Sequence, residues 1–127
     1  MRRRTYDVVM ELRRIHHVSI NVTDLDAALN FYVDTLGLSV IESRPDLGVG
    51  GAWLDAGEQE IHLLELDGFE APPGQHFAFQ VDDLASAIAT LDERGVTATA
   101  PNTMDGICSQ AFIKDPTGNL IELNQRF

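Results

Sequence analysis

The segment His17-Val-Ser-Ile-Asn-Val-Thr-Asp-Leu25 decides the fold, because its pattern returns 59 residues later as His76-Phe-Ala-Phe-Gln-Val-Asp-Asp-Leu84. Each copy alternates in polarity and then reaches an aspartate, Asp24 or Asp83. Alternation with a period of two predicts a half-buried strand. A short polar side chain before an apolar helical pattern predicts a helix N-terminus. The repeat therefore predicts a duplicated strand–helix unit.

The rest of each copy continues the correspondence. Apolar residues recur at helical spacing behind each aspartate, and Gly37 and Gly95 follow the two helices, where glycine is favoured. Residues 55–63 align with residues 115–123 at an offset of 60, and each segment predicts a turn followed by a strand. Two further strands fit in each copy, at about 38–43 and 49–55 in the first and about 96–100 and 108–114 in the second.

These elements predict an α+β fold of two tandem βαβββ modules, over residues 15–66 and 75–127, with a linker over 67–74. A unit of that size buries little core alone, so we expect the two modules to pack together. The expected result is a U-shaped mixed sheet around a cleft, with the helices outside. Residues 1–14 form an N-terminal leader outside the repeat, either a solvated tail or a short helix through Val8, Val9 and Leu12.

The composition limits the partners. The chain has 127 residues and a formal net charge of −11, and such a surface repels phosphate backbones and anionic lipid. We therefore expect no nucleic-acid partner and no membrane partner, and no apolar run approaches the roughly 20 residues of a membrane span. The single cysteine, Cys108, excludes an intramolecular disulfide. It fits a reducing cytoplasm, and we expect it to be a small strand residue.

The repeat also places metal-competent side chains at matching positions. His17 and His76 begin the first strand of each copy, and His62 and Glu122 lie on the last strand of each copy. A pseudo-twofold relation between the copies would let these four side chains converge on one point. Three imidazoles and one carboxylate suit a divalent metal ion such as Zn, Ni, Fe, Co or Mn. A lone histidine in a strand is usually structural, but three of the four histidines occupy repeat-equivalent positions.

The other candidate side chains have simpler interpretations. His16 neighbours His17 and is expected to point to the opposite face of the strand, as a structural residue. Glu65 lies three positions after His62, hence on the other face, and the alignment pairs it with Asn124. Glu65 stays open as the alternative fourth ligand. Core packing is the favoured role of three aromatic residues that could also line a cleft: Trp53, Phe77 and Phe79.

The chain resembles a known family at both ends of the repeat. The segment from His17 to Leu25, then Asn30-Phe31-Tyr32 and Leu36-Gly37-Leu38, resembles the opening module of the vicinal oxygen chelate superfamily (glyoxalase/bleomycin resistance protein/extradiol dioxygenase). Asp115-Pro-Thr-Gly-Asn-Leu-Ile-Glu-Leu123 resembles its closing strand, whose glutamate is a metal ligand in that family. The resemblance covers about residues 15–124. It implies paired βαβββ modules, a divalent metal in a U-shaped cleft and a homodimer.

By position, the resemblance carries metal-ligand roles onto His17, His76 and Glu122, with His62 at the more variable fourth position. Glyoxalase I-like members have Glu or Gln there, so His62 argues against lactoylglutathione lyase itself. The acidity of the chain fits poorly with a glutathione or coenzyme A site, and Arg44, Arg94 and Lys114 are the cations that stay open for an anionic substrate.

The expected chemistry is chelation of two vicinal substrate oxygens by a metal that stabilises an enolate or oxyanion. We expect a metal-dependent glyoxalase-like lyase or isomerase that acts on a small-molecule metabolite, with His62 and Glu122 as catalytic residues. Two alternatives stay open. One is an Fe(II)-dependent ring-cleaving dioxygenase, and the other is a metal-free, bleomycin-resistance-like protein that binds an antibiotic or another small molecule.

Overall fold

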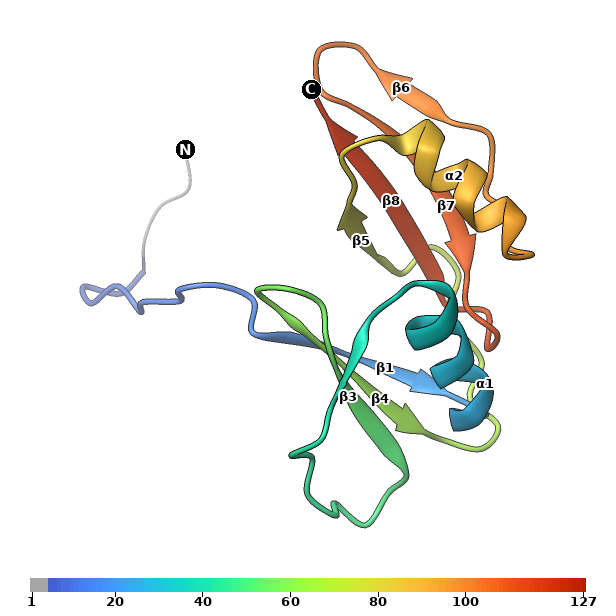
Figure 1. Cartoon of the computed structure of the whole chain (residues 1–127). Coiled ribbons are helices and arrows are strands. Elements are labelled where there is room, and N and C mark those ends of the chain that lie inside the picture. The colour runs from blue at the N-terminus through green and yellow to red at the C-terminus, as the bar shows by residue number, and fades with distance from the viewer. Residues whose placement is uncertain (1–4) are drawn as a thin grey trace.

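The computed structural model describes residues 5–127 and confirms the predicted pair of βαβββ modules (Figure 1). The first module contains β1 (His17–Val22), α1 (Leu25–Leu29), its π-helical continuation η1 (Asn30–Thr35), β2 (Ser39–Ile41), β3 (Gly51–Asp55) and β4 (Glu60–Glu65). The second contains β5 (His76–Gln80), α2 (Leu84–Glu93), β6 (Asn102–Met104), β7 (Cys108–Lys114) and β8 (Leu120–Arg126).

Both modules build the same four-stranded mixed sheet. The strand orders are β1-β4-β3-β2 and β5-β8-β7-β6, so the first strand of each module lies at an edge. It pairs in parallel with the last strand, and the other neighbours are antiparallel. Ser19 lies opposite His62 in one sheet, and Ala78 lies opposite Glu122 in the other. Among residues 5–127, no strand pairing joins the two sheets.

The predicted helix ends are confirmed. The carboxylates of Asp24 and Asp83 accept hydrogen bonds from the amides of Ala27 and Ser86, each at 3.0 Å. These bonds satisfy amides that have no partner within the first helical turn. Gly37 and Gly95 follow the helices with φ of 85° and 84°. A residue with a Cβ rarely adopts such an angle, which explains glycine at both positions.

One apolar cluster fills the space between each sheet and its helix and continues through both modules. Phe77 and Phe79 pack against this cluster, as expected, and Cys108 is a buried strand residue. The side of each sheet turned away from its helix is called the open face below. The largest fully buried apolar side chains are those of Tyr32, Leu54, Leu63, Ile113, Ile121 and Val22.

The strand predicted over residues 96–100 is wrong, since β6 runs from Asn102 to Met104. The segment still lies beside β7, because the Thr99 amide donates to the Phe112 carbonyl at 2.9 Å. The return bond goes to a side chain, since the Phe112 amide donates to Thr99 Oγ1 at 2.9 Å. Pro101, two residues after Thr99, has no amide hydrogen to donate to β7. A hydroxyl therefore replaces the backbone carbonyl that a regular ladder would use.

The short helix considered for the N-terminal leader is also wrong for its described part, because residues 5–16 contain no helix. This segment projects away from the two modules in Figure 1. Val8 and Leu12 are 85% and 84% exposed, so no apolar surface supports a helix there. A short helix without such support is marginal in water. The prediction for residues 1–4 lies outside the described residues. Within residues 5–127, no helix has the length and apolarity that crossing a membrane requires.

A buried polar cluster joins the modules. The Tyr32 hydroxyl, which is fully buried, donates to Asp115 Oδ2 at 2.8 Å. Asp115 Oδ1 accepts from the amides of Thr117, Gly118 and Asn119 at 2.8–3.0 Å. Asn119 Nδ2 in turn donates to the Asn21 carbonyl at 2.9 Å. Burial, reinforced by the Asp115 carboxylate, raises the pKa of Tyr32, so its hydroxyl keeps its proton and donates at neutral pH.

We predict that Tyr32→Phe lowers the free energy of unfolding by about 1–3 kcal/mol, because a buried carboxylate oxygen loses a donor. Urea denaturation followed by circular dichroism measures this loss. Tyr6→Phe is the matched control, since Tyr6 is 82% exposed and should change stability by less than about 0.5 kcal/mol. Equal stability of the two variants would contradict the role given to the Tyr32–Asp115 bond.

Candidate functional site

The first module brings two of the predicted ligands together on its open face. The imidazole rings of His17 on β1 and His62 on β4 stack, with centroids 3.9 Å apart and planes 13° apart. The Trp53 ring on β3 stacks on His62 at 4.6 Å. Because β4 lies between β1 and β3, the three rings form a continuous row across the sheet. Trp53 therefore belongs to the open face, and the core position favoured for it is wrong.

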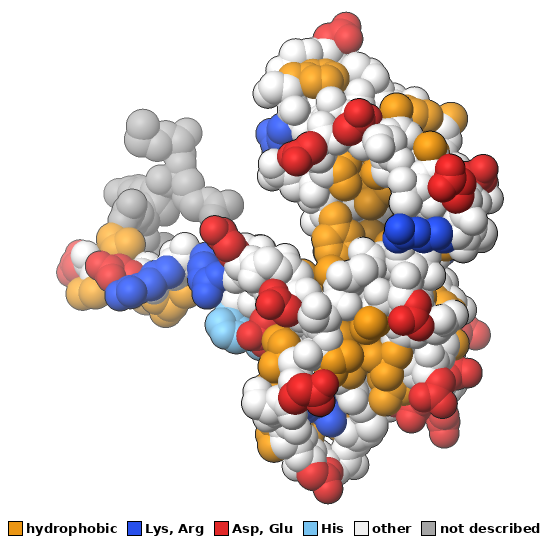
Figure 2. Space-filling model, in the orientation of Figure 1, with side chains coloured by type: hydrophobic (Ala, Val, Ile, Leu, Met, Phe, Trp, Pro, Cys, Tyr) orange, Lys and Arg blue, Asp and Glu red, His pale blue; other side chains and the backbone are white. Residues whose placement is uncertain are grey.

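The ring nitrogens of this pair have partners that the sequence did not reveal. His62 Nε2 lies 2.9 Å from Glu60 Oε1, on the same strand and face. His17 Nδ1 lies 3.0 Å from His16 Nδ1. The expectation that His16 points away from His17 is wrong, because β1 begins at His17 and strand alternation does not extend to His16. Figure 2 shows exposed histidine surface where the N-terminal segment joins the first module.

The second module brings the other two predicted ligands together. His76 Nε2 lies 3.1 Å from Glu122 Oε1, and the Glu122 residue is 8% exposed. His76 Nδ1 lies 2.9 Å from the Gly74 carbonyl, which can only accept, so Nδ1 carries a proton. In a neutral imidazole, Nε2 then directs a lone pair at a carboxylate oxygen. This contact is favourable when a proton, carried by either partner, or another cation lies between the nitrogen and the oxygen.

The four predicted ligands form two pairs, not one cluster. Within residues 5–127 of a single chain, no three His, Cys, Asp or Glu side chains gather closely enough to hold a metal ion. The expected convergence of His17, His62, His76 and Glu122 is therefore absent from a single chain. The physical reason is that the pairs lie on two sheets without strand pairing between them. The roles of these residues as metal ligands stay predictions.

Glu65 has a structural role on the other face of β4. Its Oε2 accepts from the Leu25 amide at 2.8 Å, so it caps α1. In the second module, Gln125 Oε1 accepts from the Leu84 amide at 2.8 Å and caps α2. The structural counterpart of Glu65 is thus Gln125, and the alignment of Glu65 with Asn124 is wrong. Asn124 lies on the open face instead, where its Nδ2 donates to Glu122 Oε2 at 2.7 Å.

Two of the three cations considered for an anionic substrate bind the chain's own backbone. Arg44 Nη2 donates to the Val49 carbonyl at 3.0 Å, and Arg94 Nη1 donates to the Thr35 carbonyl at 2.7 Å. Lys114 is exposed at the end of β7. Of these three cations, only Lys114 is therefore without a bond to the backbone in the described part of the chain.

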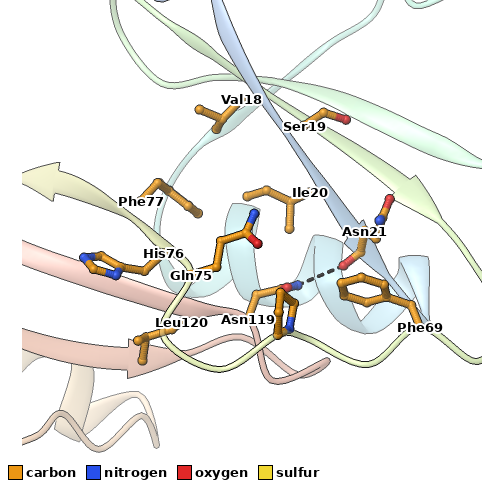
Figure 3. Close-up of a pocket in the computed structure, with 11 residues that line it drawn as sticks. Val18, Ser19, Ile20, Asn21, Phe69, Gln75, His76, Phe77, Asn119 and Leu120 are labelled. Carbon is orange, nitrogen blue, oxygen red and sulfur yellow. Dashed lines mark hydrogen bonds between the residues drawn. The ribbon is translucent and has the colours of Figure 1, made fainter.

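A separate hollow of about 320 Å³ lies at the junction of the modules, between β1, the linker and the beginnings of β5 and β8. Figure 3 shows Asn119 bonded to Asn21 across it and His76 at its edge. The His76 imidazole points away from Ile20 and Gln75. The nitrogen that faces Glu122 therefore belongs to the open face and not to this hollow.

We predict that Glu65→Ala lowers the free energy of unfolding by about 1 kcal/mol, because the first amide of α1 loses its acceptor. Chemical denaturation measures the change. Glu70→Ala is the matched control, since Glu70 is an exposed linker glutamate. A Glu65→Ala protein as stable as the Glu70→Ala protein would show that the cap contributes nothing.

Known proteins share this sequence pattern. Residues 14–123 match the family model for the Glyoxalase/Bleomycin resistance protein/Dioxygenase superfamily. Methylmalonyl-CoA epimerase of Mus musculus is 28% identical over 134 residues, which cover 92% of this chain and 75% of that protein. A probable chloroplastic lactoylglutathione lyase of Arabidopsis thaliana is 31% identical over 126 residues, covering 90% of this chain and 36% of that protein. The chain thus spans about a third of the plant protein.

Solved structures share the fold. A putative glyoxalase family protein from Bacillus anthracis has a TM-score of 0.85 and 25% identity, covering 94% of this chain and 100% of that one. An antibiotic binding protein from Streptomyces sp. CB03234 has a TM-score of 0.76 and 30% identity, with the same coverage of both chains. The names of these similar proteins include a lyase, an epimerase and a protein that binds an antibiotic.

Proposed function

Since the chain belongs to the glyoxalase/bleomycin resistance protein/dioxygenase superfamily, we propose that it is a divalent-metal-dependent lyase or isomerase whose metal is held between two copies of the chain. The observation that carries the proposal is the repeat-equivalent pairing. His17 contacts His62 on one open face, and His76 contacts Glu122 on the other. Each pair is half of a four-residue donor set.

The side chains of this donor set are of the types that bind divalent metal ions. It offers imidazole nitrogens and one carboxylate, which suit borderline divalent metals. The facing His76 nitrogen and Glu122 oxygen lie 3.1 Å apart, and a cation between them would stabilise the pair. The bond from His76 Nδ1 to the Gly74 carbonyl is of the kind that orients metal-binding histidines. When bound, such an ion would act as a Lewis acid toward two vicinal substrate oxygens.

A second copy supplies what one chain lacks. The two pairs lie on different sheets, and within residues 5–127 of one chain they do not come together. In a twofold dimer, the same surfaces of both copies meet. The His17–His62 pair of one copy would then join the His76–Glu122 pair of its partner, which gives two equal sites for each dimer.

The proposed substrate is a small metabolite with adjacent oxygens. Glu122, whose carboxylate has a second oxygen, moves its proton, and His62 serves as a ligand. Glu60 holds His62 at Nε2, and Asn124 holds Glu122 at Oε2. Fixed orientation favours proton transfer to and from a positioned substrate. The Trp53 ring beside His62 adds an apolar wall that keeps water from one side of this residue.

We predict that each chain takes up about one divalent ion, and that a complementation experiment locates it. One variant carries His17→Ala and His62→Ala, and the other carries His76→Ala and Glu122→Ala. Neither homodimer should retain metal. A doubly tagged heterodimer of the two variants should bind one ion, because one of its two shared sites keeps all four side chains. Metal analysis of the purified heterodimer measures this content.

A site within one chain gives a different result, because every chain of the heterodimer then lacks one pair and no metal is retained. That outcome would refute assembly between copies. Glu93→Gln serves as the matched control for loss of a carboxylate, since Glu93 is exposed at the end of α2. A wild-type protein that neither contains metal nor takes up Zn²⁺, Ni²⁺ or Fe²⁺ would refute the enzyme proposal.

A second candidate function is ligand binding without catalysis, favoured by the aromatic row of Trp53, His62 and His17 on an open face. Such a row offers stacking surface to a flat ligand. A metal-free wild type would place this function first. The ring-cleaving alternative has its own test, since an Fe²⁺-loaded protein would then consume oxygen with catechol.

A further inference from the structure

A row of four carboxamide side chains crosses the open face of the second sheet. Gln80 on β5 lies opposite Asn124 on β8, which lies opposite Gln110 on β7. Gln110 in turn lies opposite Asn102 on β6. Residues directly opposite one another share a face, and neighbouring strands are about 4.8 Å apart, so the row is about 14 Å long.

The row lies next to a proposed metal ligand. Asn124 follows Glu122 by two residues on β8, which puts both on the open face about 7 Å apart along the strand. Asn124 Nδ2 donates to Glu122, but Asn124 Oδ1 is buried without a hydrogen-bond partner among the described residues. Within residues 5–127, the side chains of Gln80, Gln110 and Asn102 have no hydrogen-bond partner in the protein. The row therefore has unused donors and acceptors.

The first module provides an internal comparison. Its equivalent row consists of Asn21 on β1, Leu64 on β4 and Gly51 on β3. A Cβ on Gly51 would lie 2.2 Å from the Leu63 carbonyl oxygen, so that position admits no side chain. The same fold is thus built with a single carboxamide. The four carboxamides of the second module are not required by strand pairing, and they point to a ligand.

We propose that this row binds the part of the substrate that extends beyond the metal-binding oxygens, and that it selects uncharged molecules with several hydroxyl, carbonyl or amide groups. Each carboxamide both donates and accepts, which matches such groups. None carries a charge, so an anion gains no counter-charge from the row. The inference rests on the proposed function, because it takes the face that carries Glu122 as the ligand site.

Two cations lie on the same face of the second sheet as the row and define the competing result. Arg126 is the next residue of β8 on the same face, exposed at the end of the strand. Lys114 lies opposite Leu120, beyond Glu122. An anionic ligand held by Arg126 would owe its affinity to that cation and not to the carboxamide row.

The test uses ¹⁵N-labelled, Zn²⁺-loaded full-length protein and two matched probes, D-fructose and D-fructose 6-phosphate. We expect D-fructose to shift the side-chain amide signals of the row saturably and to bind at least as tightly as its phosphate. Asn124→Leu should weaken D-fructose binding about tenfold. Gln80→Ala, at an exposed position that the fold does not need, should weaken it several-fold. Asn30→Leu, on the exposed helix surface, should leave it unchanged.

If D-fructose does not shift the side-chain amide signals of the row, the inference is wrong. Binding of the phosphate alone that is lost in Arg126→Gln would also overturn it. These results are separable from failure of the proposed function, because metal content is measured independently. If the protein holds Zn²⁺ but its carboxamide signals do not shift, ligand binding by the row is refuted and the metal site is not. A protein whose signals respond although it takes up no metal refutes the metal site alone.

Discussion

The Tyr32 hydroxyl reaches from the helix of the first module to Asp115, whose other oxygen is already saturated by three amides of its own turn. This bond and the Asn119 bridge to β1 are two of the polar connections between the modules, and the bonds from Thr23 to Thr117 and from Arg94 to Thr35 are others. The placement of both open faces depends on these bonds and on the shared apolar cluster, since no strand ladder crosses between the sheets in the described chain.

Duplication preserved the frame of each module and let the side chains on it diverge. Glu65 and Gln125 cap the two helices from equivalent positions with different charges. His62 and Glu122 lie at equivalent points opposite Ser19 and Ala78. The geometry is therefore repeated, while the donor chemistry and the polarity of the neighbouring rows differ between the modules. Such a division fits a site that is assembled from two unlike halves.

Local patterns in the sequence were sufficient for local structure. Alternation and turn residues predicted β7 with its correct ends, and the two aspartates predicted both helix N-termini. The π-helical turn η1 escaped prediction, because its backbone bonding has no simple residue signature. Alternation also predicted that Glu65 lies on the other face of β4 from His62. It carries no information on the angle between sheets, so it could not show that the four ligands form two pairs.

The connection between the modules has a mechanical consequence. Each sheet is held by its own ladder, whereas the two sheets are joined by the shared apolar cluster and by side-chain bonds such as Tyr32–Asp115 and Arg94–Thr35. A change in the angle between the sheets would therefore break no strand ladder, and it would move the two open faces relative to one another. A substitution in the turn at Asp115, which contains no histidine, would act on the spacing of the two pairs through this angle.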